Sequence, residues 1–390
     1  MMRNTFMGYR NADGSAGIRN HVVVLPMVIC ANSVVQQIEK RVPEVIAIPH
    51  THGCTLDPRS NQEMTDVLGG IGSNPNVSAI ILVALGCESV IMDDVAKIIA
   101  RTKKPVETLV IQQLGGTKKT IAKGVQIARA LLRDANKRER QPIPYSELNV
   151  GTECGGSDAY SGLSANPAVG VASDIHVDHG GTVILSEITE FLGAEMILAD
   201  RCASPEVRDK LLDLVAWTEQ SLASLGSSSV ADITPGNLKG GLTTIEEKSL
   251  GCIKKGGSRA VQEVVGYGER PTKRGLVVMD TPGHDIESMT GMAAGGAHLI
   301  VFTTGRGTPT GTPICPVIKV SSNTTCYLNM QDNIDLDAGL VLTKKETLDT
   351  MGQIIHDEMI QVASGKRTKA ELSENREFAL RRYGSDCIIY

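Results

Sequence analysis

Hydrophobic residues in this chain gather in short runs, and each run ends in a polar, glycine-rich turn. Segments with helical periodicity, such as residues 31–41 and 121–137, follow several of these runs. Short apolar runs bounded by turn residues predict buried strands, and their alternation with helices predicts a parallel α/β sheet. The strands expected in the first part of the chain are residues 21–28, 44–48, 77–85 and 106–111.

The same alternation continues beyond a charged segment with two prolines, residues 138–144, which we interpret as a linker. We therefore expect two α/β domains with mainly parallel sheets, residues 1–145 and residues 146–390. Residues 344–380 have mixed charge and helical periodicity, and predict a covering pair of helices. The later strands are expected at residues 183–185, 275–279, 298–302 and 317–320.

Composition narrows the class of protein. The 390 residues include 40 glycines but only four phenylalanines and one tryptophan, which favours aliphatic cores with many tight turns. The net charge of −5 comes from interleaved acids and bases, so no nucleic-acid surface is indicated. The longest apolar runs are too short to cross a membrane, and the first residues do not resemble a signal peptide. We expect a cytoplasmic protein, whose nine cysteines are free, metal-binding or catalytic rather than in disulfides.

Residues 152–167 form the most distinctive polar segment. The segment follows a predicted strand and contains Gly155, Gly156 and Gly162, which allow backbone amides to approach a ligand closely. Its many small polar residues cannot form core, and a long ordered loop is often functional. We interpret it as a binding loop, with a plain solvated loop as the alternative.

Three thiols stand in equivalent places in this pattern. Cys54, Cys87 and Cys154 each lie in the loop that follows a predicted strand. Parallel sheets bind ligands at the carboxyl ends of their strands, and thiolates beside imidazole or carboxylate suit iron or zinc. Three thiolates can also hold an iron–sulfur cluster with one open iron. The alternative is that each cysteine packs a strand-to-loop corner. The neighbouring residues that support a metal site are His52, Glu88 and Glu153.

Other polar loop residues suit a small, oxygen-rich acid. Arg306 lies between two glycines, and its planar guanidinium matches a carboxylate. Lys248 is a candidate base, with a surface ion pair as the alternative. No dinucleotide-binding glycine motif or phosphate-binding lysine motif is present, which argues against a dehydrogenase or a nucleotide hydrolase. The candidate substrate-binding residues beside Arg306 are Ser157, Asp158, Asn166 and Thr304.

Several longer motifs are spread along the chain. They are Gly17-Ile-Arg-Asn20, His52-Gly-Cys54, Leu85-Gly-Cys-Glu88, Glu153-Cys-Gly-Gly-Ser-Asp158, Ser164-Ala-Asn-Pro167, Gly241-Leu-Thr-Thr-Ile-Glu-Glu-Lys-Ser-Leu-Gly251, Met279-Asp-Thr-Pro-Gly283 and Phe302-Thr-Thr-Gly-Arg-Gly-Thr-Pro309. Together these motifs resemble the altronate dehydratase/galactarate dehydratase family, and the resemblance extends from about residue 6 to residue 378.

This resemblance implies an iron-dependent lyase that acts on a sugar acid, with Fe²⁺ or an iron–sulfur cluster and Mn²⁺ as an alternative metal. It also implies a dimerising domain over residues 1–145 and a Rossmann-like catalytic domain over residues 146–390. Full-length members carry an additional amino-terminal β-clip (SAF) domain. The chain therefore resembles the large subunit of a split form, for which we expect a small SAF partner in a homodimer or hetero-oligomer.

We expect metal-assisted β-elimination from a 2,3-dihydroxy acid. His52 or Lys248 would remove the C2 proton, and Glu88 or Glu153 would assist the leaving hydroxyl. A related group that releases sulfite from sulfolactate is the alternative, and a non-catalytic metal- or acid-binding subunit is a second. The histidine-bearing segment at residues 50–54 and the motif at residues 279–283 favour the dehydratase. Residues 55–59 depart from the family pattern, which leaves the sugar acid open.

Overall fold

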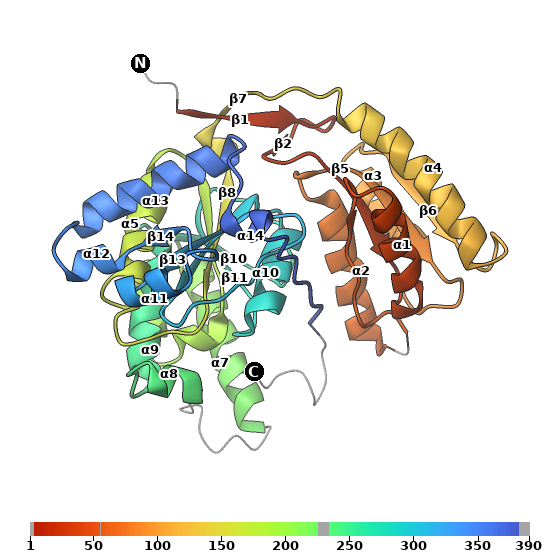
Figure 1. The fold of residues 1–390 in the computed structure, drawn as a ribbon. Helices are drawn as coiled ribbons and strands as arrows, with labels where there is room; N and C mark the ends of the chain where they lie inside the picture. The colour runs from red at the N-terminus through yellow and green to blue at the C-terminus, as the bar shows by residue number, and fades with distance from the viewer. Residues whose placement is uncertain (1–3, 55, 225–233, 382–390) are drawn as a thin grey trace.

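The computed structural model describes residues 4–54, 56–224 and 234–381. Figure 1 shows two lobes beneath a small antiparallel sheet that contains β1 (Thr5–Arg10) and β7 (Gln141–Pro144). We call them the N-terminal lobe, built on a four-stranded parallel sheet, and the C-terminal lobe, built on a seven-stranded parallel sheet. This architecture confirms the predicted α/β fold with mainly parallel sheets. None of the helices within the described ranges is both long and apolar enough to cross a lipid bilayer.

The N-terminal lobe has helices on both faces of its sheet. Strand β5 (Val77–Ala84) is buried along its whole length, as its continuous apolar run predicted. Helices α1 and α4 pack on one face, and α2 and α3 pack on the other. The sheet order is β4-β3-β5-β6. The other elements are β3 (His21–Pro26), α1 (Asn32–Arg41), β4 (Ile46–Ala47), α2 (Pro58–Ser73), α3 (Met92–Ala100), β6 (Val106–Val110) and α4 (Thr117–Ala135).

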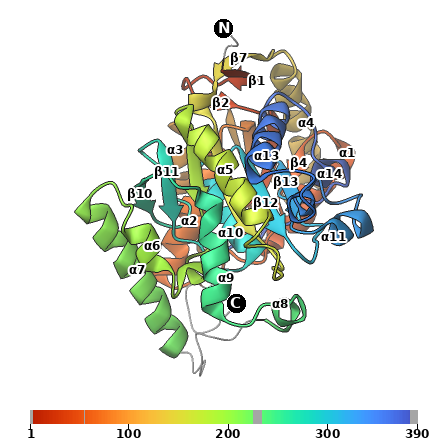
Figure 2. The same ribbon diagram turned by 90° about the vertical axis from the view of Figure 1, so that its left-hand side faces the viewer.

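The C-terminal lobe has the strand order β10-β11-β9-β8-β12-β13-β14. Helices α5 and α13 lie side by side over one face of this sheet, as both ribbon views show (Figure 2). Helix α10 packs on the opposite face, toward the N-terminal lobe. The strands are β8 (Asn149–Cys154), β9 (Thr182–Leu185), β10 (Val261–Val265), β11 (Gly275–Met279), β12 (Leu299–Thr304), β13 (Val317–Ser321) and β14 (Leu336–Asp337). The helices are α5 (Ala165–Asp178), α6 (Glu195–Ala199), α7 (Pro205–Ser224), α8 (Pro235–Lys239), α9 (Ile245–Cys252), α10 (Asp285–Ala294), α11 (Thr324–Asn329), α12 (Gly339–Leu342), α13 (Leu348–Ala363) and α14 (Lys369–Leu372).

The expected linker at residues 138–144 contains a strand. Strand β7 pairs antiparallel with β1, and Ile143 is the register partner of Phe6. Both side chains are fully buried and join the core of the C-terminal lobe. The two prolines of β7 do not prevent pairing, because an edge strand needs fewer backbone donors. The start of the chain therefore packs against the C-terminal lobe before it enters the N-terminal one.

Two buried asparagines join the lobes at the amino ends of their strands. The Asn76 amide donates to the carbonyl oxygens of His298 at 2.7 Å and Ile314 at 2.9 Å. The Asn74 amide donates to two more carbonyl oxygens of the C-terminal lobe, those of Ala293 and Ala297. Helix α2 also packs closely against α10, and one apolar core extends across both lobes. Because the amino ends meet, the carboxyl ends of both sheets point away from this junction (Figure 1).

Candidate active site

The carboxyl ends of four adjacent strands bring polar side chains together in the C-terminal lobe. These strands are β11, β9, β8 and β12, which are neighbours in that order. Glu153 and Cys154 end β8, Glu187 follows β9, and Asp285 begins α10 after β11. Because all four strands are parallel, their ends meet at one edge, where α/β proteins bind ligands.

A pair of buried thiols lies at this edge. The sulfur of Cys154 is 3.9 Å from that of Cys252, at the end of α9, and 3.0 Å from the hydroxyl oxygen of Ser157. The contact with Cys252 lowers the pKa of Cys154 to about 6, despite burial. The same contact, together with burial, raises the pKa of Cys252 well above its ordinary value. One thiolate shared by the pair is therefore the favoured charge state.

Two lysines hold two glutamates beside the thiols. The Lys255 ammonium is 2.7 Å from Glu187 and 3.2 Å from Glu190, and the Lys248 ammonium is 2.8 Å from Glu190. Burial alone would raise the pKa of Glu190, but the two lysines lower it to about 2. Burial lowers the pKa of Lys248, but Glu190 and the two thiols raise it more, so its pKa lies above the ordinary value. Both lysines are therefore charged at neutral pH.

Three carboxyl groups cluster nearby, and among them only Glu187 forms a salt bridge within the described residues. Ligand atoms of Glu153, Glu187 and Asp285 lie within 4.8 Å of one another. The buried Oε1 atoms of Glu153 and Glu187 have no hydrogen-bond partner among the residues that the structure describes. Burial raises the pKa values of both glutamates, and burial with the charge of Glu190 raises the pKa of Asp285 to about 6. Glu187 also has φ of 68°, a left-handed conformation that costs a non-glycine residue energy and is often found at functional sites.

The predicted binding loop is ordered around Asp158. Its Oδ1 accepts from the hydroxyls of Ser161 and Ser322 at 2.8 and 2.7 Å, and its Oδ2 accepts from the Asn323 amide at 2.8 Å. Gly305 packs so closely that an added Cβ would lie 2.3 Å from the Asp158 carboxyl carbon. Asp158 therefore orders the loop, and its oxygens are already occupied by the protein.

Three other predicted substrate-binding residues lie around the same loop. The Thr304 hydroxyl donates to the Gly156 carbonyl and accepts from a backbone amide, so it shapes the turn. Arg306 has an exposed side chain, and none of the salt bridges in the described residues involves it. Asn166 is fully buried. Its Oδ1 accepts from Thr303, and its Nδ2 has no partner. Arg306 and Asn166 are therefore the donors that the protein leaves open.

The remaining predicted residues lie at the carboxyl edge of the N-terminal lobe. The loops that carry Cys54 and Cys87 adjoin, because the Ser89 amide donates to the Gly53 carbonyl at 2.9 Å. Both cysteines are exposed. One oxygen of Glu88 accepts from three backbone amides of its own loop. His52 lies in the same loop as Cys54, and Thr55 lies outside the described residues.

The structure thus divides the predicted residues between two sheet edges. Within the described ranges, the groups of three potential metal ligands within 4.8 Å are Cys154–Glu190–Cys252 and Glu153–Glu187–Asp285. Neither group includes Cys54 or Cys87, so a site shared by Cys54, Cys87 and Cys154 stays a prediction. The site residues that sequence reasoning did not select are Glu187, Glu190, Cys252, Lys255 and Asp285.

Some of these residues carried a usable signal. Glu187 and Glu190 follow a predicted strand, as Cys154 does, so the same topological argument could have selected them. Asp285 follows the motif after strand β11 in the same way. Cys252 and Lys255 belong to a helical segment far along the chain, and nothing in their local pattern marks them.

Two models of known protein families match this chain. Residues 145–385 match the family model described as D-galactarate/altronate dehydratase, C-terminal. Residues 8–136 match the model described as D-galactarate dehydratase/altronate hydrolase, second domain. Together the two models cover both lobes.

The similar proteins include sugar-acid dehydratases and a subunit of a sulfo-lyase. The chain is 38% identical to the galactarate dehydratase (L-threo-forming) of Escherichia coli, over 93% of this chain and 73% of that protein. It is 33% identical to the altronate dehydratase of Bacillus subtilis, over 97% of this chain and 78% of that protein. It is also 38% identical to the (2R)-sulfolactate sulfo-lyase subunit beta of Chromohalobacter salexigens, over 97% of each chain. These matches confirm the resemblance drawn from the motifs, and the chain belongs to the D-galactarate/altronate dehydratase family.

Proposed function

We propose that this protein is a hydro-lyase that removes water from a sugar acid such as D-altronate and yields a 2-keto-3-deoxy acid. One structural observation supports this proposal in addition to family membership. Two charged lysines, two thiols and four carboxylates lie buried or half-buried at one sheet edge, beside the open donors of Arg306 and Asn166. Such clusters of perturbed ionisable groups are typical of active sites.

Substrate binding follows from the open donors. The Arg306 guanidinium would bind the carboxylate with two parallel hydrogen bonds. The unpartnered Nδ2 of Asn166 would donate to a substrate hydroxyl. Ser157, whose hydroxyl contacts Cys154, would orient a second hydroxyl. Asp158 and Thr304 would hold the loop that positions these groups.

The elimination needs a base, an acid and stabilisation of a developing enolate. The Lys248 ammonium is paired with Glu190 and stays charged, so it suits electrostatic stabilisation better than proton abstraction. His52 is then our candidate base for the C2 proton. The C3–O bond breaks as Glu153 or Glu88 protonates the leaving hydroxyl, and water departs. The resulting enol tautomerises to the 2-keto acid.

A divalent metal fits the buried carboxylates. Glu153, Glu187 and Asp285 each place one ligand atom within 4.8 Å of the others, and within the described residues the Oε1 atoms of Glu153 and Glu187 lack hydrogen-bond partners. Glu187 pairs with Lys255, whereas Glu153 and Asp285 form no salt bridge within the described residues, so a cation would relieve the cost of burying their charge. We propose Fe²⁺, with Mn²⁺ as the alternative, held by these three residues with Cys154 and Cys252 alongside. The bound metal would supply Lewis-acid stabilisation of the enolate. An iron–sulfur cluster would also require Cys54 and Cys87 to approach Cys154.

A sulfolactate lyase is the second candidate function. The sulfo-lyase subunit matches this chain over 97% of both lengths, whereas the dehydratases are longer proteins. The chemistry is the same enolate formation with sulfite as the leaving group. In either case we propose a small SAF-domain partner in a homodimer or hetero-oligomer, located in the cytoplasm. A non-catalytic metal- or acid-binding subunit is the remaining alternative.

Parallel assays separate these functions. The protein would be purified without oxygen, supplied with Fe²⁺ and tested on D-altronate, galactarate and (2R)-sulfolactate, with and without a co-expressed SAF protein. Formation of a 2-keto-3-deoxy acid supports the dehydratase, and release of sulfite supports the lyase. Absence of turnover on all three substrates, even with the SAF protein, would leave the non-catalytic subunit.

A further inference from the structure

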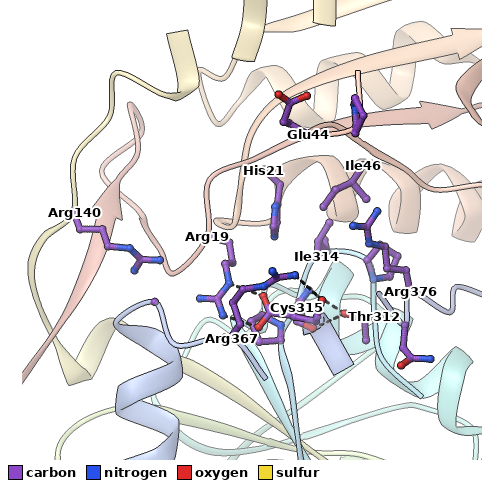
Figure 3. A pocket seen from close by; sticks show the side chains of 16 residues that line it. Arg19, His21, Glu44, Ile46, Arg140, Thr312, Ile314, Cys315, Arg367 and Arg376 are labelled. Carbon is purple, nitrogen blue, oxygen red and sulfur yellow. Dashed lines mark hydrogen bonds and ion pairs between the residues drawn. The ribbon is translucent and has the colours of Figure 1, made fainter. Parts of the chain in front are cut away.

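A separate pocket lies at the edge of the sheets opposite the candidate active site. Its volume is about 340 Å³, and its walls come from the start of β3, the start of β4, the residues before β13 and the chain after α13 (Figure 3). Strands of this length span roughly 17–20 Å, so this pocket is separate from the carboxyl edge. Its size is within the range of small-molecule sites.

Arginines dominate the lining of this pocket. Figure 3 shows Arg19, Arg140, Arg367 and Arg376 around the same space, with His21 and Glu44 on the N-terminal lobe. Glu371 also lines the pocket. Four guanidinium groups therefore face two carboxylates, which gives the lining an excess of positive charge.

The existing ion pairs leave part of this charge uncompensated. Arg19 is buried and forms two hydrogen bonds to Glu371, at 2.7 and 2.8 Å, so this pair is neutral. Arg376 pairs with Glu39 at 2.9 Å. Arg140 and Arg367 take part in none of the salt bridges between described residues.

The partners of these last two arginines are backbone carbonyls, which do not neutralise a charge. Arg140 donates to the carbonyl oxygens of Met7, Ile18 and Ala363 and lies over the Tyr9 ring, and Arg367 donates to the carbonyl oxygen of Glu371. Each guanidinium has five N–H donors, so donors remain for a ligand. The lining also includes Asn375, whose buried Oδ1 has no hydrogen-bond partner and could accept from a hydroxyl.

We propose that this pocket binds a small polyanion that carries carboxylate or phosphate groups. Planar guanidinium groups bind both kinds of oxyanion through paired hydrogen bonds. A ligand there would contact both lobes, because His21 and Glu44 come from one and residues 312–316 from the other. Its binding would therefore stabilise the junction between the lobes, by an amount that rises with the logarithm of ligand concentration.

Isothermal titration calorimetry at low salt tests this site with two probes, inorganic phosphate and succinate. All titrations use an Arg306→Ala background, which removes the carboxylate donor proposed for the catalytic site. Binding of succinate alone would indicate a carboxylate ligand, and binding of phosphate would indicate a phosphorylated one. We expect Arg367→Glu to weaken binding at least tenfold, and Arg376→Ala to weaken it as well.

Arg274→Glu is the matched control for charge reversal. Arg274 is exposed and precedes β11, four strands away from β13 in the same sheet. This variant should bind the probe as tightly as the background protein, and circular dichroism should show that both reversals remain folded. The proposal is overturned if neither probe binds, or if Arg367→Glu and Arg274→Glu weaken binding equally.

Discussion

The sulfur atoms of Cys154 and Cys252 lie 3.9 Å apart, although 98 positions separate the two residues in the chain. One residue ends a core strand and the other ends a short helix, so the contact depends on the packing of two separate elements. This contact lowers the pKa of Cys154 to about 6. Thiolate character at the site therefore depends on the partner thiol.

Replacement of Cys252 tests that dependence. In Cys252→Ala the hydrogen bond to Cys154 is lost, and burial alone should raise the pKa of Cys154 above about 6. Thiolate absorbance followed from pH 5 to pH 9 measures the change. Cys315→Ala removes a buried thiol elsewhere and serves as the control. An unchanged titration in Cys252→Ala would show that another group sets the charge of Cys154.

Lys255 should be essential for folding stability. Lys255→Met leaves Glu187 and Glu190 with one buried cation fewer, and loss of one partner in a buried ion pair costs about 3–5 kcal/mol. Urea unfolding measures the loss. Lys97→Met removes the cation of an exposed pair with Asp94 and should change stability little. Equal effects of the two substitutions would contradict a special role for the buried pair.

Acid should destabilise the protein through buried histidines. His298 donates from Nε2 to the Ala16 carbonyl and accepts at Nδ1 from the Asn149 amide, so its ring is neutral. Burial lowers its pKa from 6.5 to about 4. The unfolded chain then binds a proton that the folded chain does not, and stability falls as pH drops from 6.5 to 4.

Melting temperature measured between pH 8 and pH 4 checks this expectation. His21, His50, His176 and His356 also have pKa values lowered to about 4 by burial, so their effects should add. A melting temperature that is constant, or that rises, between pH 6.5 and pH 4 would contradict the neutral state of these rings.

Metal binding by Glu153, Glu187 and Asp285 can be tested without an assay of enzyme activity. Fe²⁺ or Mn²⁺ should raise the melting temperature of the protein, because a ligand that binds only the folded state stabilises it. Asp285→Asn should remove most of this increase. The control is Asp66→Asn, an acid on α2 whose oxygens accept from Gln62. An increase that survives in Asp285→Asn would place the metal elsewhere.

Arg306 should contribute to substrate affinity and not to folding. A charge-assisted hydrogen bond contributes about 1.5–3 kcal/mol, so Arg306→Ala should lower kcat/KM by about 10- to 150-fold, mainly through KM. Its melting temperature should match that of the parent protein, because the side chain is exposed. A lower kcat with an unchanged KM would instead place Arg306 at the reacting atoms.

The sequence allowed the sheet edges to be predicted but not the partners across the site. The apolar run of β5 and the loop after Cys154 were recognisable, because burial and chain reversal leave local patterns. Lys255 was not selected from the sequence, because its salt-bridge partners within the described residues, Glu187 and Glu190, lie in another part of the chain.

Asp158 illustrates the opposite case. Its acidic side chain in a glycine-rich loop suggested a substrate ligand, but three hydroxyl and amide groups of the protein already occupy its oxygens. Glu88 likewise accepts from three amides of its own loop. A sequence shows which groups can bind a ligand, but only packing shows which of them remain available.

The asparagine junction has a consequence for how this chain can be divided. Asn76 satisfies two carbonyl oxygens of the other lobe, and the apolar core beside it continues from α2 into α10. A fragment that ended between the two family regions would leave those groups unsatisfied and that apolar face in water. We therefore expect that neither family region folds as an autonomous unit and that the two lobes unfold together.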